Sequence, residues 1–368
     1  MNILVTGAKG FVGQNLVAIL KSQTNYEIFE FDRDSDPKLL KEYCKRADFI
    51  FHLAGVNRPK DTQEFAQDNV DLIRIIIDSL SEYKNSCPII FSSSIQATVD
   101  NPYGKSKKEG EELLLEYGNT SGAKVMIFRI PNVFGKWCRP NYNSFVATLC
   151  YNVIHDIPIE IHDPNHLMNL VYIDDLVRAM ADKIQANEQS LGYCNVPVSY
   201  FVTLEKISEL IHSFKKGRET LYIPDVSDDF TKKLYSTYIS YLPKEQLNYK
   251  LMKNVDHRGS FTEFMKGSEF GQLSVNISKP GIIRGNHYHH VKHEKFLIIS
   301  GEAILRLRRI NSVNMVQYTL RGEEQEIVDI PAGYAHNIEN VGSTDLIIII
   351  WACESYDPEN PDTYYMEV

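Results

Sequence analysis

The stretch GAKGFVG, residues 7–13, decides the fold of the first part of this 368-residue chain. It follows an apolar run, Asn2 to Thr6, that predicts a β-strand, and it leads into helical spacing over Asn15 to Ser22. Glycine lets phosphate groups approach the backbone, and the free N–H groups at the start of a helix bind their charge. The stretch therefore predicts a dinucleotide-binding unit, with a tight structural turn as the alternative.

Short apolar runs alternate with amphipathic stretches as far as about residue 130, which is the pattern of βαβ units that build a buried parallel sheet. The predicted strands are Asn2–Thr6, Glu27–Phe31, Phe49–Ala54, Ile89–Ser92 and Val125–Ile130. The predicted helices are Asn15–Ser22, Val70–Tyr83 and Pro102–Tyr117. From Pro131 to about Tyr241 we expect a mixed segment that forms a lid over one edge of the sheet. The fold class of this part is α/β, a Rossmann-type doubly wound sheet.

The character of the chain changes after Pro243, where glycines, histidines and alternating strands appear. Short strands separated by turn residues are typical of a small antiparallel barrel or sandwich. The predicted strands are Gln272–Ile277, Phe296–Ile299, Ala303–Arg308, Glu326–Asp329 and Leu346–Trp351. We therefore predict two domains, residues 1–243 and residues 244–368, the second of them all-β.

The amino-acid composition excludes several classes of partner and indicates the cellular compartment. The net charge of −9 and the pI near 5.7 provide no basic surface of the kind that collects nucleic acid or anionic lipid. The six cysteines form no C-x-x-C pair, which favours reduced thiols in the cytosol. The longest apolar run, Leu346 to Ala352, is far shorter than the roughly 20 residues of a membrane-spanning helix. We expect a cytoplasmic protein without a targeting segment, a nucleic-acid partner or a membrane partner.

Tyr103 and Lys107 form a Y-x-x-x-K motif, preceded by three serines, 92–94, at the end of a predicted strand. Because residues four apart share one face of a helix, the ammonium can lower the pKa of the phenol, which then exchanges a proton with a carbonyl or alcohol oxygen. Ser94 would hydrogen-bond the same oxygen. The alternative is an ordinary helix surface.

The G-x-x-G-x-x-G spacing resembles the extended short-chain dehydrogenase/reductase family. HLAG at 52–55, Asn69, RIPNVFG at 129–135 and YIDDL at 172–176 agree with it, over residues 1 to about 240. The resemblance implies a catalytic set of Ser94, Tyr103 and Lys107, with Ser94 in the role of the family's serine. The cofactor-binding residues that it implies are Gly7, Gly10, Phe11, Val12, Gly13, Asp32, Arg33, Leu53, Ala54, Gly55, Asn69, Tyr103 and Lys107.

The choice of cofactor depends on the pair Asp32-Arg33 at the end of the second strand. An acidic residue there accepts hydrogen bonds from a ribose 2′-hydroxyl, whereas an arginine neutralises a 2′-phosphate. Asp32 alone would favour NAD. Arg33 permits NADP, unless it is a solvated surface charge, and a biosynthetic reduction usually draws on NADPH, so we expect NADP(H). The loop between Ser94 and Tyr103, eight residues long, is shorter than in many members of the family.

The second domain carries a histidine pattern that resembles the cupin family. Gly281, His287, His289, Glu294 and Gly301 fit its first motif, and PAGYAH at 331–336 with Asn340 fits the second, except that Gln325 replaces a glycine. His287 and His289 are two apart on one strand, so both side chains point into the barrel. We expect His287, His289, Glu294 and His336 to bind a divalent metal, Zn²⁺ first, with Fe, Mn or Ni as alternatives. A bulge could replace His289 with His290.

The same domain also resembles nucleotide-sugar 3,5-epimerases, through RGSFxE at 258–263 and RGNH at 284–287. In those enzymes the histidine of the second segment is the base that abstracts a proton. Here that histidine is His287, which we assign to the metal instead, so the base is left open. We expect Arg284 in this domain and Asn132 in the first to contact the substrate.

The pairing of the two domains resembles the CapF-type family of bifunctional capsular polysaccharide enzymes over the full chain. The resemblance implies a UDP-2-acetamido-2,6-dideoxy-4-hexulose substrate, epimerised at C3 in the cupin and then reduced at C4 by NADPH. The product would be UDP-2-acetamido-2,6-dideoxy-L-talose, on the way to N-acetyl-L-fucosamine. We expect a homodimer. The alternatives are a reductase with a non-catalytic cupin used for binding or dimerisation, and a nucleotide sensor, against which Tyr103 and Lys107 count.

Overall fold

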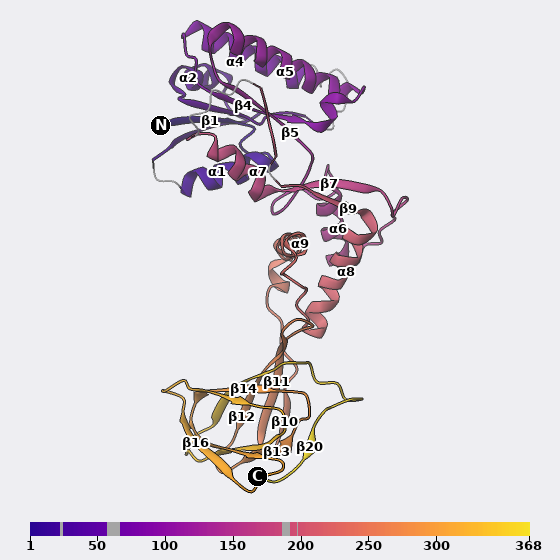
Figure 1. Ribbon diagram of the computed structural model, residues 1–368. Helices are drawn as coiled ribbons and strands as arrows, with labels where there is room; N and C mark the ends of the chain where they lie inside the picture. The colour runs from indigo at the N-terminus through magenta and orange to yellow at the C-terminus, as the bar shows by residue number, and fades with distance from the viewer. Residues whose placement is uncertain (23–24, 57–66, 186–191, 197) are drawn as a thin grey trace. The chain divides into compact units, whose positions relative to one another are not determined.

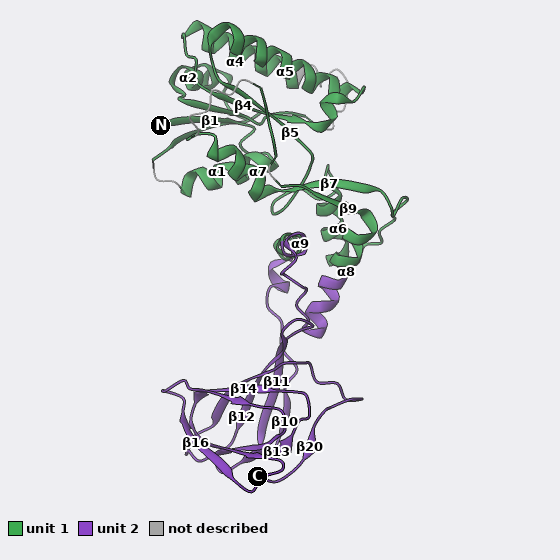
Figure 2. Ribbon diagram, viewed as in Figure 1, with its two compact units in different colours: residues 1–211, 233–241 green, residues 212–232, 242–368 purple. Residues whose placement is uncertain are grey.

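The computed structural model describes residues 1–22, 25–56, 67–185, 192–196 and 198–368. These residues form two compact units, residues 1–211 with 233–241 and residues 212–232 with 242–368 (Figure 2). The chain passes between the units at three places, whereas the sequence suggested one division after residue 243, which stays a prediction. Each unit contains one of the two candidate sites, so the units are described separately.

The first unit contains a parallel sheet with the strand order β2-β1-β3-β4-β5-β8. Because the order reverses between β1 and β3, the loops at the carboxyl ends of these two strands diverge and leave a crevice, where sheets of this kind bind ligands. The predicted α/β class is confirmed. The strands are β1 (Asn2–Thr6), β2 (Glu27–Phe31), β3 (Phe49–His52), β4 (Ile89–Ser94), β5 (Val125–Ile130) and β8 (Gly192–Cys194).

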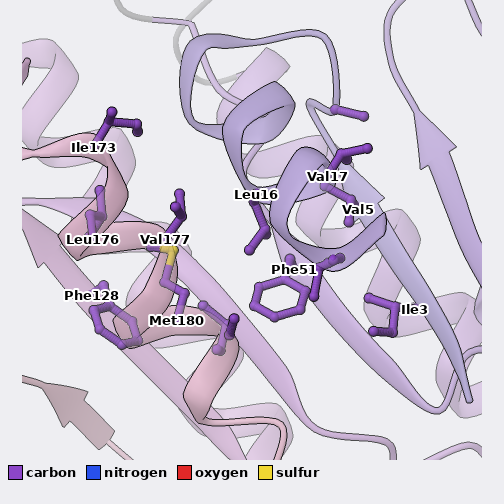
Figure 3. Packing of buried hydrophobic residues seen from close by; sticks show 14 of the residues in the cluster. Ile3, Val5, Leu16, Val17, Phe51, Phe128, Ile173, Leu176, Val177 and Met180 are labelled. Carbon is purple, nitrogen blue, oxygen red and sulfur yellow. The ribbon is translucent and has the colours of Figure 1, made fainter. Parts of the chain in front are cut away.

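Helices cover both faces of this sheet. On one face, α1 and α7 pack Leu16, Val17, Leu176 and Val177 against the strands (Figure 3). On the other face, α2, α4 and α5 bury a second apolar cluster (Figure 1). These elements are α1 (Phe11–Ser22), α2 (Pro37–Arg46), the π-helical turn η1 (Gln67–Asp71), α4 (Leu72–Glu82), the 3₁₀ turn η2 (Ile95–Thr98), α5 (Pro102–Ser121) and α7 (Ile173–Asp182).

Two boundaries differ from the sequence prediction for identifiable reasons. Helix α1 begins at Phe11 rather than Asn15. The glycine-rich turn closes at Gly10, the residue before Phe11, because Gly10 N–H donates to Gly7 O at 2.9 Å. Strand β3 ends at His52 rather than Ala54, and beyond it the backbone packs tightly on Gly7. The glycine-rich turn is therefore held between β1 and the end of β3.

The described residues after Pro131 include both strands and helices. A three-stranded sheet has the order β6-β7-β9, with β6 parallel to β7 and β9 antiparallel to it. The elements are β6 (Asn132–Phe134), α6 (Phe145–Ile154), β7 (Leu167–Tyr172), β9 (Tyr200–Thr203), α8 (Leu204–Thr220), α9 (Asp229–Ser240) and the 3₁₀ turn η3 (Lys244–Gln246). Strand β6 directly follows β5 after Pro131, so Asn132 lies close to the crevice.

Beyond residue 253 the second unit forms two antiparallel sheets, with the orders β10-β11-β12-β19-β14-β17 and β16-β15-β18-β13-β20. One apolar cluster is shared by both sheets, with Phe296 and Ile348 from the first and Leu305 and Ile338 from the second. The all-β prediction is confirmed. The strands are β10 (Asn254–Asp256), β11 (Gly259–Gly267), β12 (Gly271–Ser278), β13 (Ile283–Tyr288), β14 (Glu294–Ser300), β15 (Glu302–Arg309), β16 (Met315–Arg321), β17 (Ile327–Ile330), β18 (Tyr334–Asn340), β19 (Leu346–Ala352) and β20 (Tyr364–Tyr365).

None of the helices in the described part of the chain has the length and apolar character needed to cross a membrane. None of the six cysteines is paired in a disulfide in the described part of the chain.

Candidate active sites

The glycine-rich turn is packed so tightly that two of its positions exclude a side chain. Gly7 has a φ of +69°, and a Cβ there would lie 2.7 Å from the backbone nitrogen of Ala54. A Cβ on Gly13 would lie 2.0 Å from the carbonyl oxygen of Gly7. These glycines are therefore required by the packing of the turn, and the turn keeps its backbone exposed to a ligand.

Two adjoining cavities lie at the carboxyl ends of the strands, with volumes of about 470 and 430 Å³. They share Gly7, Gly10, Leu53 and Gly55, so an elongated ligand can span both. The larger cavity is also lined by these predicted residues: Phe11, Val12, Gly13, Ser94, Tyr103, Lys107 and Asn132. The smaller is also lined by Asp32, Arg33 and Ala54.

Asn69 is the one predicted cofactor residue that lines neither cavity. It is buried, and its Oδ1 accepts a hydrogen bond from Val56 N–H at 2.8 Å. Its amide nitrogen donates to the Ser106 hydroxyl at 3.0 Å. Asn69 therefore ties the loop after β3 to helix α5 and, in this arrangement, supports the cavity wall from behind.

Asp32 reaches the smaller cavity with its carboxylate already engaged. Its oxygens accept hydrogen bonds from the backbone N–H groups of Lys9, at 2.8 Å, and Arg33, at 2.9 Å. Lys9 forms an ion pair with Asp34 at 2.5 Å, and both side chains are largely exposed. Two cationic residues thus lie close to Asp32, Arg33 as its neighbour along the chain and Lys9 through a backbone hydrogen bond.

Ser94 and Tyr103 come together although only eight residues separate them. Ser94 ends β4 and caps the 3₁₀ turn η2, where it accepts from Gln96 N–H at 3.1 Å. A Cβ on Gly104 would lie 2.2 Å from the carbonyl oxygen of Gln96, so glycine is what allows α5 to pack on this turn. The Tyr103 phenol and the Ser94 hydroxyl are hydrogen-bonded. The short loop is therefore compatible with the predicted pair.

Lys107 lies one turn further along α5 and is almost fully buried, with 4% of its surface exposed. Its Nζ donates to the carbonyl oxygen of Ser92 at 3.0 Å and lies 6.0 Å from the centre of the Tyr103 ring. Burial lowers the pKa of Lys107 to about 8, and the negative charge of Glu111 partly opposes that shift.

The expected effect of Lys107 on Tyr103 is not what the structure shows. Burial raises the pKa of the Tyr103 phenol, and the hydrogen bond with Ser94 only partly offsets it. The ammonium is directed to the Ser92 carbonyl, so desolvation dominates. A phenol with a raised pKa keeps its proton at neutral pH, which suits it to protonate an oxygen during a reduction.

Behind this pair lies a buried carboxylate that sequence reasoning missed. Arg129 binds Glu111 in a two-pronged pair, Nε to Oε1 at 2.9 Å and Nη2 to Oε2 at 2.6 Å. The hydroxyls of Ser93 and Tyr193 donate to the same carboxylate. Glu111 follows Lys107 by four residues, so its place on the same helix face was the available signal.

In the second unit, the four predicted metal ligands converge. The candidate ligand atoms of His287, His289, Glu294 and His336 all lie within 4.8 Å of one another. His287 and His336 are directly opposed on the paired strands β13 and β18, whereas Glu294 begins β14. His290 is turned away, and its ring packs on Tyr364 instead. The set that the structure assembles contains His289, as the sequence favoured.

The residues of this cluster fit a cation. His289 Nε2 and His336 Nε2 lie 3.4 and 3.3 Å from Glu294 Oε2, yet these three buried atoms form no hydrogen bond of acceptable geometry. Burial, reinforced by the two neighbouring imidazoles, lowers the pKa of His287 to about 4, so its ring is neutral at pH 7. Buried polar atoms without partners are rare in proteins, and a divalent ion would satisfy all three.

A cavity of about 640 Å³ opens beside the cluster and is lined by His287, His289, Glu294 and His336. Arg284 also lines it, with buried Nε and Nη2 atoms that have no hydrogen-bond partner. Its nearest acid is Asp256, at 3.6 Å, too far for a hydrogen bond. Arg284 therefore offers donors to an anionic group in the cavity.

The fold and the first site define the class of protein: the chain belongs to the NAD dependent epimerase/dehydratase family, whose model matches residues 3–195. A nicotinamide dinucleotide is accordingly the cofactor class of the first site. Residues 254–364 match the model of the polysaccharide biosynthesis C-terminal domain.

Two full-length similarities narrow the class. The chain is 43% identical to the UDP-2-acetamido-2,6-beta-L-arabino-hexul-4-ose reductase of Pseudomonas aeruginosa, over 100% of this chain and 99% of that protein. It superposes on the crystal structure of the capsular polysaccharide assembling protein CapF from Staphylococcus aureus with a TM-score of 0.93, at 48% identity and full coverage of both chains. A structure of CapF with the inhibitor 3-isopropenyl-tropolone matches with a TM-score of 0.88 at 44% identity, again over both full chains.

Proposed function

We propose that the chain is a bifunctional nucleotide-sugar enzyme of capsular polysaccharide synthesis. The second unit epimerises UDP-2-acetamido-2,6-dideoxy-4-hexulose at C3, and the first unit then reduces C4 with NADPH to give UDP-2-acetamido-2,6-dideoxy-L-talose. The observation that carries the proposal is the presence of two sets of side chains, one for reduction and one for binding a cation, each lining its own cavity. The similarity to the Pseudomonas reductase over the full length supports the substrate.

The reductive half uses the hydrogen-bonded pair of Tyr103 and Ser94. Bound NADPH would supply the hydride that adds to C4. As that carbon accepts the hydride, the carbonyl oxygen becomes negatively charged, and Tyr103 donates its proton to it. Ser94 donates a hydrogen bond to the same oxygen. The buried charge of Lys107, whose Nζ lies 6.0 Å from the centre of the Tyr103 ring, would favour the phenolate once the proton has left. Asn132, which lines the same cavity, contacts the sugar.

The preference for NADPH rests on the surroundings of Asp32. Its carboxylate already accepts two backbone hydrogen bonds, so it is less available to a ribose 2′-hydroxyl than a free acid would be. Arg33 lines the same cavity, and a 2′-phosphate bound there would gain its positive charge. Both observations favour NADP(H) over NAD(H).

The epimerising half uses the cation cluster and Arg284. His287, His289, Glu294 and His336 would hold the ion, and Zn²⁺ suits three imidazoles with one carboxylate. A bound cation would stabilise the negative charge that develops on the C4 oxygen when C3 loses its proton. Arg284 binds an anionic group of the substrate. The tropolone found with CapF fits this picture, because tropolones chelate divalent metals through two adjacent oxygens.

Chemistry sets the order of the two steps. The proton at C3 is acidic only while C4 is a ketone, because the resulting carbanion must delocalise into the carbonyl group. Reduction of C4 removes that acidity, so epimerisation comes first. The two reactions thus share one oxygen, which first withdraws charge from C3 and later accepts a proton from Tyr103.

The decisive experiment separates the two steps. The metal-loaded enzyme is incubated with the 4-keto substrate in deuterated water without NADPH, and deuterium at C3 is measured by mass spectrometry. We expect exchange at C3, followed by NADPH oxidation once the cofactor is added. Absence of exchange by metal-loaded enzyme, together with normal reduction, would reject the epimerase half.

The alternative, a non-catalytic second unit used for dimerisation, has one observation in its favour. Strand β16 lies at the edge of its sheet and exposes Met315, Val316 and Tyr318 by 48%, 49% and 41%. We propose a homodimer through this edge, in addition to catalysis, because exposed apolar edge strands tend to pair. Light scattering of wild type and Tyr318→Asp tests the dimer, whereas His336→Ala tests catalysis. Lost exchange in a folded His336→Ala protein supports the epimerase.

The cysteines bear on the cellular compartment of the protein. The six free cysteines are consistent with a reducing compartment, and we propose a cytoplasmic location. Blocking the thiols of freshly lysed cells before purification, then counting the blocked cysteines, tests this point.

A further inference from the structure

The three imidazoles of the cation cluster each have a backbone partner, but one of these partners comes from far along the chain. Gly285 supplies a backbone hydrogen bond to His287, and the carbonyl of Tyr334 lies 3.5 Å from His336 Nδ1. Both partners are two residues before their histidine on the same strand. The partner of His289 Nδ1 is the carbonyl oxygen of Asp362, 73 residues away, at 2.5 Å.

This contact fixes the state in which His289 faces the cluster. A carbonyl oxygen can only accept a hydrogen bond, so the proton of the neutral ring must be on Nδ1. The lone pair is then on Nε2, the buried atom that faces Glu294 Oε2 at 3.4 Å. Orientation of a ligating imidazole through its other nitrogen is what makes such a ring a good metal ligand.

The side chain of Asp362 holds the turn that follows His289. Its carboxylate accepts from three consecutive backbone N–H groups, those of His290, Val291 and Lys292, at 2.9, 2.9 and 2.8 Å. These hydrogen bonds, led by the one from Lys292, lower the pKa of Asp362 to about 2 against the opposing effect of desolvation, so it is charged at neutral pH. One residue therefore orients the ring with its carbonyl and fixes the adjacent backbone with its carboxylate.

The residues after Asp362 attach this C-terminal segment to β13, the strand that carries His287. Strand β20 pairs with β13, with Tyr365 opposite His287, and Met366 N–H donates to Asn286 O at 3.0 Å. On the other side of Asp362, Pro361 O accepts from Lys292 Nζ at 3.1 Å. The segment of residues 361–366 thus spans the stretch that carries His287 and His289.

We propose that Asp362 is a positioning residue for the cation site, and that residues 361–366 act as a strap that pre-forms half of the ligand set. Glu294 and His336 depend on the sheet alone, because each lies in a paired strand of its own. His289 depends on the strap. The inference rests on the proposed function, since it assumes that the cluster binds a divalent ion.

The test compares Zn²⁺ affinity between the full-length wild type and Asp362→Asn. Asparagine tolerates the left-handed backbone of this position, φ +39°, so the substitution removes the charge and one acceptor without adding strain. Affinity is measured in competition with a chromogenic chelator, which needs no activity. We expect roughly tenfold weaker Zn²⁺ binding, the lower end of the loss known for outer partners of metal ligands.

Asp357→Asn is the matched control, because Asp357 lies in the same C-terminal segment but hydrogen-bonds only locally, to Glu359 N–H and the Asn360 amide. Its affinity should equal that of the wild type. Equal affinity of Asp362→Asn and wild type overturns the inference alone, whereas a wild type that binds no Zn²⁺ overturns the proposed cation site as well. If Asp362→Asn is not recovered folded, Asp362→Glu replaces it, and wild-type affinity in that variant again rejects the strap.

Discussion

The Nζ of Lys107 donates a hydrogen bond of 3.0 Å to the carbonyl oxygen of Ser92, at a point where the lysine is almost completely shielded from water. The contact ties the middle of α5 to the end of β4, the two elements that carry Tyr103 and Ser94. It also holds a positive charge where little water can solvate it. Because this desolvation lowers the pKa of Lys107, the charge at the site depends on pH.

Reduction should fail at alkaline pH, where the contribution of Lys107 to stability should increase. With a pKa of about 8, Lys107 loses its charge above that pH, and kcat/KM for reduction should then fall about tenfold per pH unit. The folded pKa is below the unfolded value of 10.5, so the unfolded state binds more protons between pH 8 and 10.5. The contribution of Lys107 to the free energy of unfolding therefore rises across this window, by an amount on the order of 3 kcal/mol. The buried thiols of Cys44 and Cys87, with pKa values raised to about 12, contribute in the opposite direction above pH 9.

Paired measurements check this prediction. Measuring kcat/KM as a function of pH identifies the loss of activity. Urea unfolding of wild type and variant at the same pH values identifies the change in stability that is due to Lys107. The difference in the free energy of unfolding between wild type and Lys107→Met should change by this amount across the window, because the other titrating groups are the same in both proteins. An activity loss that coincides with unfolding would contradict the assignment.

Tyr103→Phe should abolish reduction and leave exchange at C3 intact. The variant lacks the proton donor, for which we expect a loss of at least about 10²-fold in NADPH oxidation. The second unit contains the residues proposed for exchange, so deuterium uptake should equal that of the wild type. Tyr83→Phe, at an exposed tyrosine, is the control. Loss of both activities in Tyr103→Phe would argue against two separate sites.

Arg33→Ser should change the cofactor preference. Without the guanidinium, the smaller cavity loses a positive charge that a 2′-phosphate would contact, so KM for NADPH should rise roughly tenfold, which corresponds to about 1.4 kcal/mol. KM for NADH should be unchanged. Steady-state kinetics with both cofactors measures the difference, and Arg46→Ser, whose arginine pairs with Glu27 outside both cavities, is the control. An equal change with both cofactors would refute the assignment.

Removal of the metal should affect the second unit alone. Treatment with a strong chelator leaves His289, Glu294 and His336 with unsatisfied buried atoms, so exchange at C3 should stop and the second unit should unfold at a lower temperature. NADPH binding, measured by fluorescence, should persist. Calorimetry before and after Zn²⁺ is restored follows both effects. Exchange that continues in metal-free protein would show that the cation is not needed.

The sequence predicted those features that depend on residues near one another along the chain. The GAKGFVG turn, the run of serines and the Tyr103–Lys107 pair each lie within one βα connection or one helical turn, so spacing alone indicated their geometry. The spacing places His287 and His289 on one strand, whereas β13 ends at Tyr288 and the His289 ring beyond it is oriented by Asp362. His336 and Glu294 could be added through their motifs, since spacing alone does not reveal which strands become neighbours.

The features that escaped prediction join distant parts of the chain. Nothing near Asp362 indicates that its carbonyl meets His289, because that contact depends on where the last strand pairs. Burial was equally hard to foresee. The sequence did not indicate that Asn69 holds the loop after β3, nor that the pKa of Tyr103 is set by desolvation more than by the lysine one turn away.

The buried Glu111 carboxylate joins β4, α5 and β5 through Ser93 and Arg129. Strand β4 carries the serine and α5 the tyrosine, so the two are cross-linked behind the cavity as well as through the loop of residues 95–102. Within that loop the exposed side chain of Ile95 lines the cavity, and it offers an engineer a place to alter which sugars gain entry.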